Sequence, residues 1–355
     1  MESSSIQENI TEQIVVYDYY YEYGGEPLDG FGLVTIHKPK EFGRTFLPIS
    51  YVIICILSIP INIIFIKTLI KSKHQKKTVP INIAISDILF VITLPFWAVH
   101  AYKEWIFGNN MCKTITVTYI TTLYSSILFI TCISVDRYLS VVGNFSNRHF
   151  TPINNTLVCI VVWSLSILAA APHWTFVKEQ EIHSKKVCSY DFGQDHMPPW
   201  KILIKIQLNI FGFLMPFLIM LFCYLQVQCA IAKFKVGERY KGRKLVMIVV
   251  FFMLWFPYNF VTFLHFLQNL HVISSCFTAL HLYVAVQVTE VMAYSHAFIN
   301  PIVYSFVNKS VWRMCFAKLC GERCRRSTEY SLECSDNTDT KSVQIGGIEL
   351  KAVQR

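Results

Sequence analysis

Residues 111–142 read MCKTITVTYITTLYSSILFITCISVDRYLSVV, an apolar stretch long enough to cross the hydrocarbon core of a membrane as one helix. The stretch begins near Cys112 and ends in the triplet Asp136-Arg137-Tyr138. At 1.5 Å of rise per residue, about 37 Å of helix separates Cys112 from Arg137. One end therefore lies at each face of a bilayer, and this segment decides the predicted fold.

The rest of the chain has the composition of a membrane protein. Of its 355 residues, 53% are hydrophobic and 15% are charged, which is too few charges for an ordinary soluble globule. Six further apolar stretches of sufficient length lie at 46–70, 79–102, 153–174, 200–233, 244–268 and 279–307. Buried helices of a large soluble protein would carry polar faces at helical spacing, which most of these stretches lack. We predict an all-α membrane protein, a seven-transmembrane helix bundle.

The positions of Lys and Arg predict how the bundle is oriented, because short cytoplasmic loops retain positive residues. Such residues follow the first span, lie between the fifth and sixth spans, and follow the seventh: Lys71, Lys73, Lys76, Lys77, Lys233, Lys235, Arg239, Lys241, Arg243, Lys244, Arg313, Lys318, Arg323, Arg325 and Arg326. Residues 1–30 hold no Lys or Arg and no apolar core, so we expect the first span to act as its own insertion signal. The amino terminus is thus predicted outside the cell. The net charge of +9 indicates topology, and we expect no nucleic-acid partner.

Four domains are predicted along the chain: an extracellular acidic, tyrosine-rich arm (1–44), the seven-transmembrane bundle (45–308), a short amphipathic cytosolic eighth helix (309–320) and a disordered cytosolic tail (321–355). The arm and the tail are too polar to bury a core. The two halves of the bundle share no repeat and no corresponding Gly-interrupted spans, which are typical of secondary transporters. A transporter therefore stays a second class of hypothesis.

The twelve cysteines lack metal-ligand spacing, and most lie inside spans. Cys112, Cys188 and Cys276 fall on the outer, oxidising side, where a disulfide can persist. Three outer cysteines leave one without a partner. The cysteine spacing therefore predicts no metal centre, and we expect no other bound cofactor on this ground.

Polar residues deep within spans are candidates for function because they are costly in lipid. The deepest are Asn62, Asp87, Glu290, His296 and Asn300. Interhelical hydrogen bonding is a sufficient explanation for Asn62. A carboxylate at Asp87 needs a proton or a cation partner near the middle of the membrane.

Motifs in every span resemble those of the rhodopsin-like G-protein-coupled receptors, over about residues 46–320. Beside Asp136-Arg137-Tyr138 they are, in order, Asn62, Ile83-Ala84-Ile85-Ser86-Asp87, Trp163, Pro216, Tyr224, Trp255-Phe256-Pro257 and Asn300-Pro301-Ile302-Val303-Tyr304. One such triplet is weak, but the ordered series is specific.

Within that family the chain is most similar to chemokine receptors of the C-C type. The resemblance is carried by Asn82-Ile83-Ala84-Ile85-Ser86-Asp87-Ile88-Leu89-Phe90, Thr93-Leu94-Pro95-Phe96-Trp97, Trp105-Ile106-Phe107-Gly108, Met111-Cys112-Lys113, Phe256-Pro257-Tyr258-Asn259 and Gln287-Val288-Thr289-Glu290. Pro95 is expected to kink its helix, with Thr93 able to bond the freed carbonyl region.

The resemblance implies a ligand pocket formed by Tyr51, Trp97, Tyr119, Tyr258 and Glu290. In this interpretation Glu290 binds the amino-terminal ammonium of an inserted chemokine. The alternative is a structural ion pair, for which Lys205 is the one candidate partner.

For activation, the resemblance implies roles for Asp136, Arg137, Tyr138, Tyr224, Trp255, Pro257, Asn300, Pro301 and Tyr304. An allosteric sodium ion is implied at Asp87, Ser126, His296 and Asn300, where it would stabilise the inactive state. Arg137, released from Asp136, would face the G protein when the sixth helix opens about Pro257.

The outer surface carries the remaining predicted sites. Tyrosines in acidic surroundings of the arm are candidates for sulfation: Tyr17, Tyr19, Tyr20, Tyr21 and Tyr23. Asn9 begins a glycosylation sequon. We expect Cys112 to pair with Cys188, with Cys188–Cys276 as the alternative. Chemokine receptors usually have a further cysteine in the arm, but here none precedes Cys55, so Cys276 is predicted unpaired.

The predicted function is that of a plasma-membrane receptor and not of an enzyme. It binds a C-C type chemokine and activates a heterotrimeric G protein of the inhibitory class, leading to calcium mobilisation and chemotaxis. Arrestin is expected to bind the phosphorylated tail, and membrane lipid surrounds the bundle. Three alternatives stay open: a chemokine-sequestering decoy, a constitutively active viral homologue, and a receptor for a non-chemokine peptide.

Overall fold

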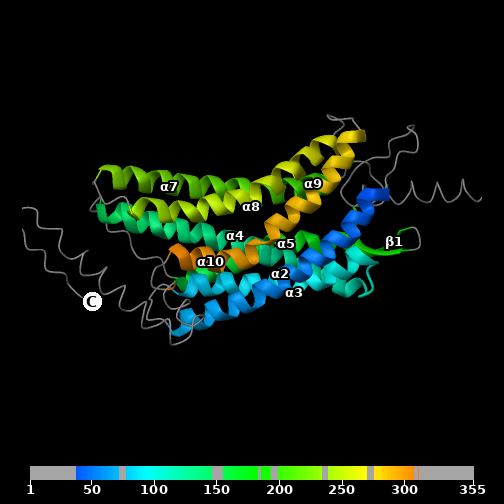
Figure 1. Cartoon of the computed structure of the whole chain (residues 1–355), viewed down its shortest axis with the longest axis horizontal. Coiled ribbons are helices and arrows are strands. Elements are labelled where there is room, and N and C mark those ends of the chain that lie inside the picture. The colour runs from blue at the N-terminus through cyan, green and yellow to red at the C-terminus, as the bar shows by residue number, and fades with distance from the viewer. Residues whose placement is uncertain are drawn as a thin grey trace, which may run out of the picture.

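The computed structural model describes residues 37–71, 77–145, 155–182, 185–192, 199–233, 239–269, 276–307 and 311. These residues form a bundle of long helices with one β-hairpin at one end (Figure 1). We call the end that carries this hairpin the hairpin end, and the other the opposite end. The predicted arm before residue 37, the eighth helix and the tail lie outside the described residues, apart from buried Val311.

The described residues form seven helical segments, in the order predicted. Their elements are α2 (His37–Lys71), α3 (Thr78–Tyr102), α4 (Asn109–Phe145), α5 (Asn155–Phe176), α6 (Pro199–Asn209) with η1 (Ile210–Leu214) and α7 (Met215–Lys233), α8 (Arg239–Asn269), and α9 (Cys276–Tyr294) with α10 (His296–Val307). Most ends lie within a few residues of the predicted ones. The first helix begins earlier, at His37 instead of 46, because a helix already formed in the bilayer extends readily into polar sequence.

Five of the described helices are long and apolar enough to cross a membrane by themselves: Phe42–Lys71, Thr78–Tyr102, Asn109–Ser140, Asn155–Phe176 and Ile206–Ala230. In the sixth and seventh segments the apolar helical parts are shorter, Val249–Leu264 and His296–Val307. The seventh segment is interrupted by a turn at Ser295 and carries Glu290 in its first half. Composition alone therefore understates these two segments, which pack into the same bundle.

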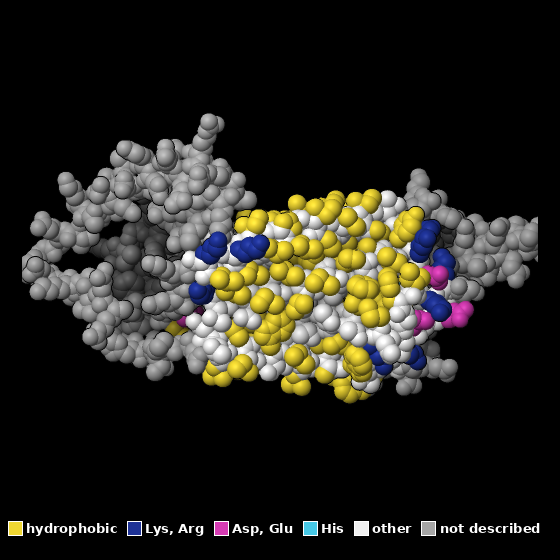
Figure 2. Space-filling model, turned by 90° about the horizontal axis from the view of Figure 1, so that it is seen from below, with side chains coloured by type: hydrophobic (Ala, Val, Ile, Leu, Met, Phe, Trp, Pro, Cys, Tyr) yellow, Lys and Arg dark blue, Asp and Glu magenta, His cyan; other side chains and the backbone are white. Residues whose placement is uncertain are grey.

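The helix α4 is the centre of the bundle, since it packs against α3, α5 and α7. Core side chains such as Phe90, Phe129 and Met220 are completely buried. The outward faces are also apolar, with Ile56 66% and Leu168 70% exposed. Figure 2 shows this as an apolar belt with charged side chains at both ends. Such a surface is stable in lipid, where the helices satisfy their own backbone hydrogen bonds.

Prolines inside the helices remove backbone donors, and side chains from neighbouring helices replace them. Pro301 has no N–H to offer the carbonyl of Ala297, and Asn62 Nδ2 donates to that oxygen at 2.7 Å. Asn62 thus provides the interhelical hydrogen bond expected of it. Pro95 similarly leaves the carbonyl of Val91, which accepts a hydrogen bond from the Cys55 thiol at 3.5 Å.

Two local features were not predicted. One is η1, a turn of π-helix in which the Met215 N–H donates to the Ile210 carbonyl, just before Pro216. The other is the antiparallel hairpin of β1 (Val177–Ile182) and β2 (Lys185–Tyr190), in which Glu179 pairs with Cys188. The loop after α3 is joined to β2, because the Trp105 N–H donates to the Lys186 carbonyl at 2.7 Å.

Candidate functional site

A disulfide joins the hairpin to the bundle. Cys112 in the first turn of α4 is bonded to Cys188 of β2, as predicted, and both residues are buried. Trp105, also fully buried, packs in the same cluster. The bond and this cluster hold the hairpin over the hairpin end of α4. Cys276 begins α9, and its side chain lies outside the described part of the chain.

The Glu290 carboxylate lies inside the hairpin half of the bundle, 8% exposed, and is held by tyrosine hydroxyls. Tyr294, one helical turn further along α9, donates a short hydrogen bond to Glu290 Oε1. Tyr51 of α2 donates to the same oxygen at 3.4 Å. Lys205 lies on α6, and its side chain is not among those described. The described hydrogen-bond partners of Glu290 are therefore neutral hydroxyl donors, which belong to an aromatic cluster.

The other predicted pocket residues lie around this carboxylate. The Tyr119 hydroxyl of α4 is 2.6 Å from that of Tyr294, and Tyr258 of α8 is close enough to Glu290 for an electrostatic interaction. The Trp97 ring of α3 lies 6.2 Å from the Tyr119 ring, centroid to centroid. The five predicted residues thus lie around one region of the bundle, and their role in binding a ligand stays a prediction.

Tyr294 is the pocket residue that sequence reasoning missed. Its hydroxyl contacts both Glu290 and Tyr119, and its ring stacks against Tyr51 at 5.8 Å. The available signal was its spacing, since residues four apart lie on one face of a helix. The spacing of four residues therefore predicts that Tyr294 and Glu290 share a face of the helix.

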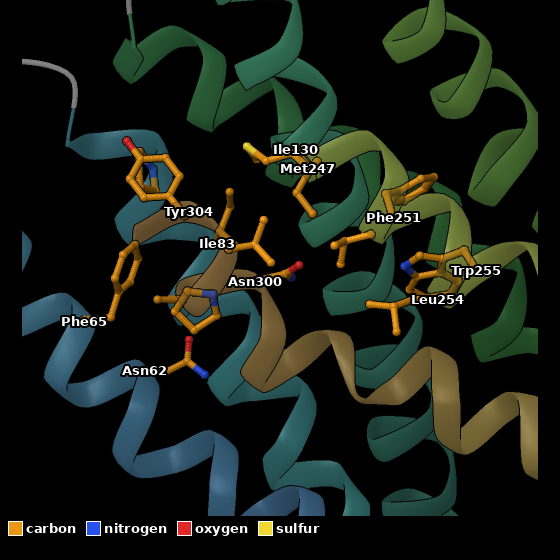
Figure 3. A pocket seen from close by; sticks show the side chains of 15 residues that line it. Asn62, Phe65, Ile83, Ile130, Met247, Phe251, Leu254, Trp255, Asn300 and Tyr304 are labelled. Atoms are coloured by element: carbon orange, nitrogen blue, oxygen red, sulfur yellow. The ribbon is translucent and has the colours of Figure 1, made fainter. Parts of the chain in front are cut away.

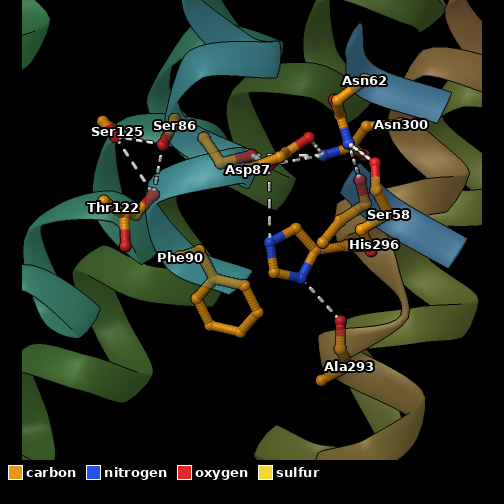
Figure 4. Close-up of polar contacts among 12 residues, drawn as sticks. Ser58, Asn62, Ser86, Asp87, Phe90, Thr122, Ser125, Ala293, His296 and Asn300 are labelled. Atoms are coloured by element: carbon orange, nitrogen blue, oxygen red, sulfur yellow. Dashed lines mark hydrogen bonds and ion pairs between the residues drawn. The ribbon is translucent and has the colours of Figure 1, made fainter. Parts of the chain in front are cut away.

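The four residues predicted for a sodium site also come together: Asp87, His296 and Asn300 face one another in Figure 4, and Ser126 is hydrogen-bonded to Asp87. Ser126 Oγ donates to Asp87 Oδ1 at 2.8 Å, and Asn300 Nδ2 donates to Asp87 Oδ2 at 3.1 Å. His296 Nε2 lies 3.7 Å from Asp87 Oδ1. Asp87 is completely buried, with Ser126 1% and His296 2% exposed. A carboxylate in this position requires compensation of its charge.

The donor set fits a small monovalent cation. His296 Nδ1 must donate to the carbonyl of Ala293 at 2.7 Å, because a carbonyl can only accept. In a neutral ring, Nε2 then presents a lone pair toward the Asp87 oxygen, and within the described part of the chain this buried nitrogen has no hydrogen-bond partner. Asp87 and Ser126 supply the oxygen ligands that hard cations prefer. The described residues contain no cluster of three His, Cys, Asp or Glu side chains suited to a metal.

Phe90, fully buried on α3, links the two clusters. Its ring centroid lies 5.1 Å from Tyr294 and 5.0 Å from His296. His296 in turn lies 5.2 Å from Trp255 of α8. Phe90 stood within a recognised motif, but nothing in the sequence assigned it a role. A continuous series of ring contacts therefore runs from Tyr294, which is hydrogen-bonded to Glu290, to Trp255.

Among the remaining activation residues, the triplet near the end of α4 lies toward the opposite end. Asp136, Arg137 and Tyr138 are partly buried on α4, and the Tyr138 ring packs against Phe222 of α7 at 5.9 Å. Between this level and Trp255 there is a small, partly open cavity (Figure 3). Its lining includes Phe251 of α8 and Tyr304 and Asn300 of α10, with Pro301 beside them. Pro257 lies within α8, and Tyr224 of α7 packs against the core.

The predicted surface modifications fall outside the described residues. These are the glycosylation site at Asn9 and the sulfation candidates Tyr17, Tyr19, Tyr20, Tyr21 and Tyr23.

Comparison with known proteins agrees with this architecture. Residues 61–304 match the family described as 7 transmembrane receptor (rhodopsin family), so the chain belongs to this family of multi-pass membrane proteins. It is 36% identical over 300 residues to atypical chemokine receptor 2 of Mus musculus, which covers 82% of this chain and 78% of the relative. It is 35% identical over 277 residues to C-C chemokine receptor type 1 of Homo sapiens (76% and 78%) and 36% identical over 295 residues to CX3C chemokine receptor 1 of Homo sapiens (79% and 81%). Within the family it is thus a chemokine receptor, and not an enzyme.

Proposed function

We propose that the protein binds a C-C type chemokine at its hairpin end and activates a heterotrimeric G protein of the inhibitory class at its opposite end. Calcium mobilisation and chemotaxis are the expected cellular responses. The observation that carries the proposal is the Glu290 carboxylate, buried in the hairpin half of the bundle and bonded to Tyr51 and Tyr294. The relatives named C-C chemokine receptors support the ligand class.

Glu290 suits the amino-terminal ammonium of a ligand segment that enters the bundle. The tyrosine hydroxyls orient the carboxylate without neutralising it, and the surrounding rings provide cation–π surfaces. A charge-assisted hydrogen bond is strongest where water is excluded, and Glu290 is 8% exposed. The acidic arm would attract a basic chemokine from a distance and raise the rate of encounter.

The hairpin end is the extracellular one in this proposal. The Cys112–Cys188 disulfide at this end requires an oxidising compartment. In Figure 2 the acidic side chains gather at the hairpin end, among Lys and Arg, and further Lys and Arg stand at the opposite end. Lys71 and Lys77 lie there, in agreement with cytoplasmic retention of positive charge.

The conformational change of activation would be transmitted through contacts between packed rings. A ligand on Glu290 moves Tyr294, which contacts Phe90, and Phe90 contacts His296 beside Trp255. An outward swing of α8 about Pro257 would then open the cavity lined by Phe251 and release Arg137 toward the G protein. A ligand drives this change only if it binds the active state more tightly than the inactive one.

Asp87, Ser126, His296 and Asn300 would hold a sodium ion in the inactive state. The ion supplies a positive charge that compensates the buried Asp87 carboxylate. Ser126 and Asn300 link α4 and α10 to α3 through their hydrogen bonds to Asp87. Loss of these hydrogen bonds would free the three helices to shift.

The test is a binding screen of the whole receptor in membranes against a panel of chemokines, followed by G-protein nucleotide exchange with the ligand that binds best. We expect one or more C-C chemokines to bind and to stimulate exchange, and Arg137→Ala to keep binding while losing exchange. Saturable binding of none of them would refute the ligand class. Full exchange by Arg137→Ala would contradict the coupling role.

A chemokine-sequestering decoy is the second candidate function, and the 36% identity to an atypical chemokine receptor favours it. The intact Asp136-Arg137-Tyr138 triplet favours coupling. Chemokine binding and uptake without nucleotide exchange would establish the decoy. Nucleotide exchange in the absence of ligand would instead indicate a constitutively active receptor. Nucleotide exchange stimulated by a non-chemokine peptide would show that the ligand belongs to another class.

A further inference from the structure

At the hairpin end, α2 meets α9 in a contact where any side chain at position 43 of α2 would displace a side chain of α9. Gly43 is buried there, and a Cβ atom added to it would lie 2.6 Å from Gln287 Nε2 and 2.7 Å from Gln287 Oε1. Carbon atoms do not approach amide atoms so closely. Only glycine therefore fits under this side chain without moving it.

Gln287 is itself firmly enclosed. It is 1% exposed, and its buried Oε1 has no hydrogen-bond partner among the described groups. The enclosure of Gln287 leaves its amide little room to move away from a larger residue at position 43. The contact is a close fit of helix backbone against side chain.

The same pair of helices contains the anchor of the proposed pocket. Gly43, Leu47 and Tyr51 follow at a spacing of four residues on one face of α2, and Tyr51 donates to Glu290. Gln287 and Glu290 are three residues apart on α9 and lie on one face. The Gly43–Gln287 contact is thus about 12 Å nearer the arm along α2 than the Tyr51–Glu290 bond.

No cysteine precedes Cys55 in the sequence, and Cys55 of α2 is a free thiol that donates to the Val91 carbonyl, so no disulfide among the described residues ties α2 to α9. The disulfide described at this end joins α4 to β2 instead. The distance between α2 and α9 near the arm consequently depends on non-covalent packing.

We propose that Gly43 and Gln287 form a positioning contact that holds Glu290 where Tyr51 and Tyr294 bind its carboxylate, and so sets the sensitivity of the receptor to a chemokine amino terminus. Gly43 does not touch the ligand and acts through α9. The inference rests on the proposed role of Glu290 as the ligand anchor.

The test enlarges residue 43 and then restores the space. In cells, surface expression, affinity and nucleotide-exchange potency are measured with the C-C chemokine that binds best in the panel, for Gly43→Ala, Gly43→Leu, Gln287→Ala, and each Gly43 variant combined with Gln287→Ala. We expect Gly43→Leu to lower potency by about tenfold or more, Gly43→Ala by less, and affinity to change by less than about threefold because the arm still captures the ligand. The leucine adds as many heavy atoms as Gln287→Ala removes, so the double variant should regain the potency of Gln287→Ala alone.

Arg44→Ala is the matched control. Arg44 is adjacent to Gly43 but exposed, and its Nε donates to the Tyr102 carbonyl of α3 at 2.8 Å. Its replacement should change potency by less than about threefold. If Gly43→Leu fails to reach the surface, Gly43→Ala with and without Gln287→Ala decides by the same criterion.

Normal potency of the Gly43 variants, or a loss that Gln287→Ala does not reverse, refutes the positioning contact. Glu290→Gln measured in parallel separates the two hypotheses. A loss of potency in Glu290→Gln beside normal Gly43 variants overturns the contact alone. Normal potency in Glu290→Gln overturns the anchor and the contact together.

Discussion

Replacement of Glu290 by Gln removes the charge of the proposed anchor while preserving its shape. Gln keeps an acceptor oxygen, so the hydrogen bonds from Tyr51 and Tyr294 can persist. What disappears is the charge-assisted bond to a ligand ammonium, which contributes about 1.5–3 kcal/mol. Signalling potency should therefore fall by about one to two decades. Chemokine binding, which is dominated by the arm, should change less.

The assay is G-protein nucleotide exchange in membranes, with the best-binding C-C chemokine and an amino-terminally acetylated form of it. Acetylation removes the ammonium, so it should weaken the unmodified receptor and have little further effect on Glu290→Gln. Full potency of Glu290→Gln, or independent losses from acetylation and mutation, would show that the anchor is wrongly assigned.

A structural ion pair with Lys205 gives a different outcome. In that case Glu290→Gln should be poorly expressed, because removing one partner leaves a buried charge uncompensated. Lys205→Met should then reproduce the defect. Surface expression of both variants, measured beside potency, separates the two explanations.

Three further predictions concern other parts of the chain. Asn62→Ala should lower the free energy of unfolding by about 1–3 kcal/mol, seen as a lower thermal midpoint, because the Ala297 carbonyl loses its donor. Adding Pro301→Ala restores a backbone N–H and should recover part of the loss. An unchanged midpoint for Asn62→Ala would contradict the argument. Asp87→Asn should abolish the difference in ligand-free nucleotide exchange between sodium chloride and choline chloride, and a sodium effect equal to that of the unmodified receptor would exclude the site. The arm tyrosines to be replaced by Phe are Tyr17, Tyr19, Tyr20, Tyr21 and Tyr23. Chemokine binding should weaken most at low salt, where screening is least. The same salt dependence of binding in the variant and the unmodified receptor would exclude electrostatic capture by sulfates.

The sequence was sufficient for the helices and for much of the candidate site. Apolar stretches locate the spans because a bilayer demands continuous helices of a minimum length. The pairing of Cys112 with Cys188 was also predicted correctly. Asp87 and Asn300, far apart in the chain, could be grouped only through the resemblance, since no local pattern connects α3 with α10.

What escaped prediction depends on contacts between distant segments. The strands β1 and β2 have no clear alternation of apolar and polar residues, and Cys188 is fixed by its bond to α4. Phe90 looks like any other core residue until α10 brings His296 against it. Gly43 could not be recognised before the side chain of Gln287 was seen above it.

The π-helical turn η1 has a consequence for how the fifth segment can vary. A π-turn completes one full turn with about one residue more than an α-turn, so deleting one residue within Ile210–Leu214 would restore α-helix and leave the faces before and after it nearly aligned. Gln207, whose Nε2 donates to the Ala169 carbonyl of α5 at 2.7 Å, would then still face that partner. The same deletion within the regular helix after Met215 would instead rotate the parts on either side of it by about 100° and disturb the faces that pack against α4 and α8. The π-turn is therefore the place in this segment where a single residue can be removed while α6 and α7 keep their faces.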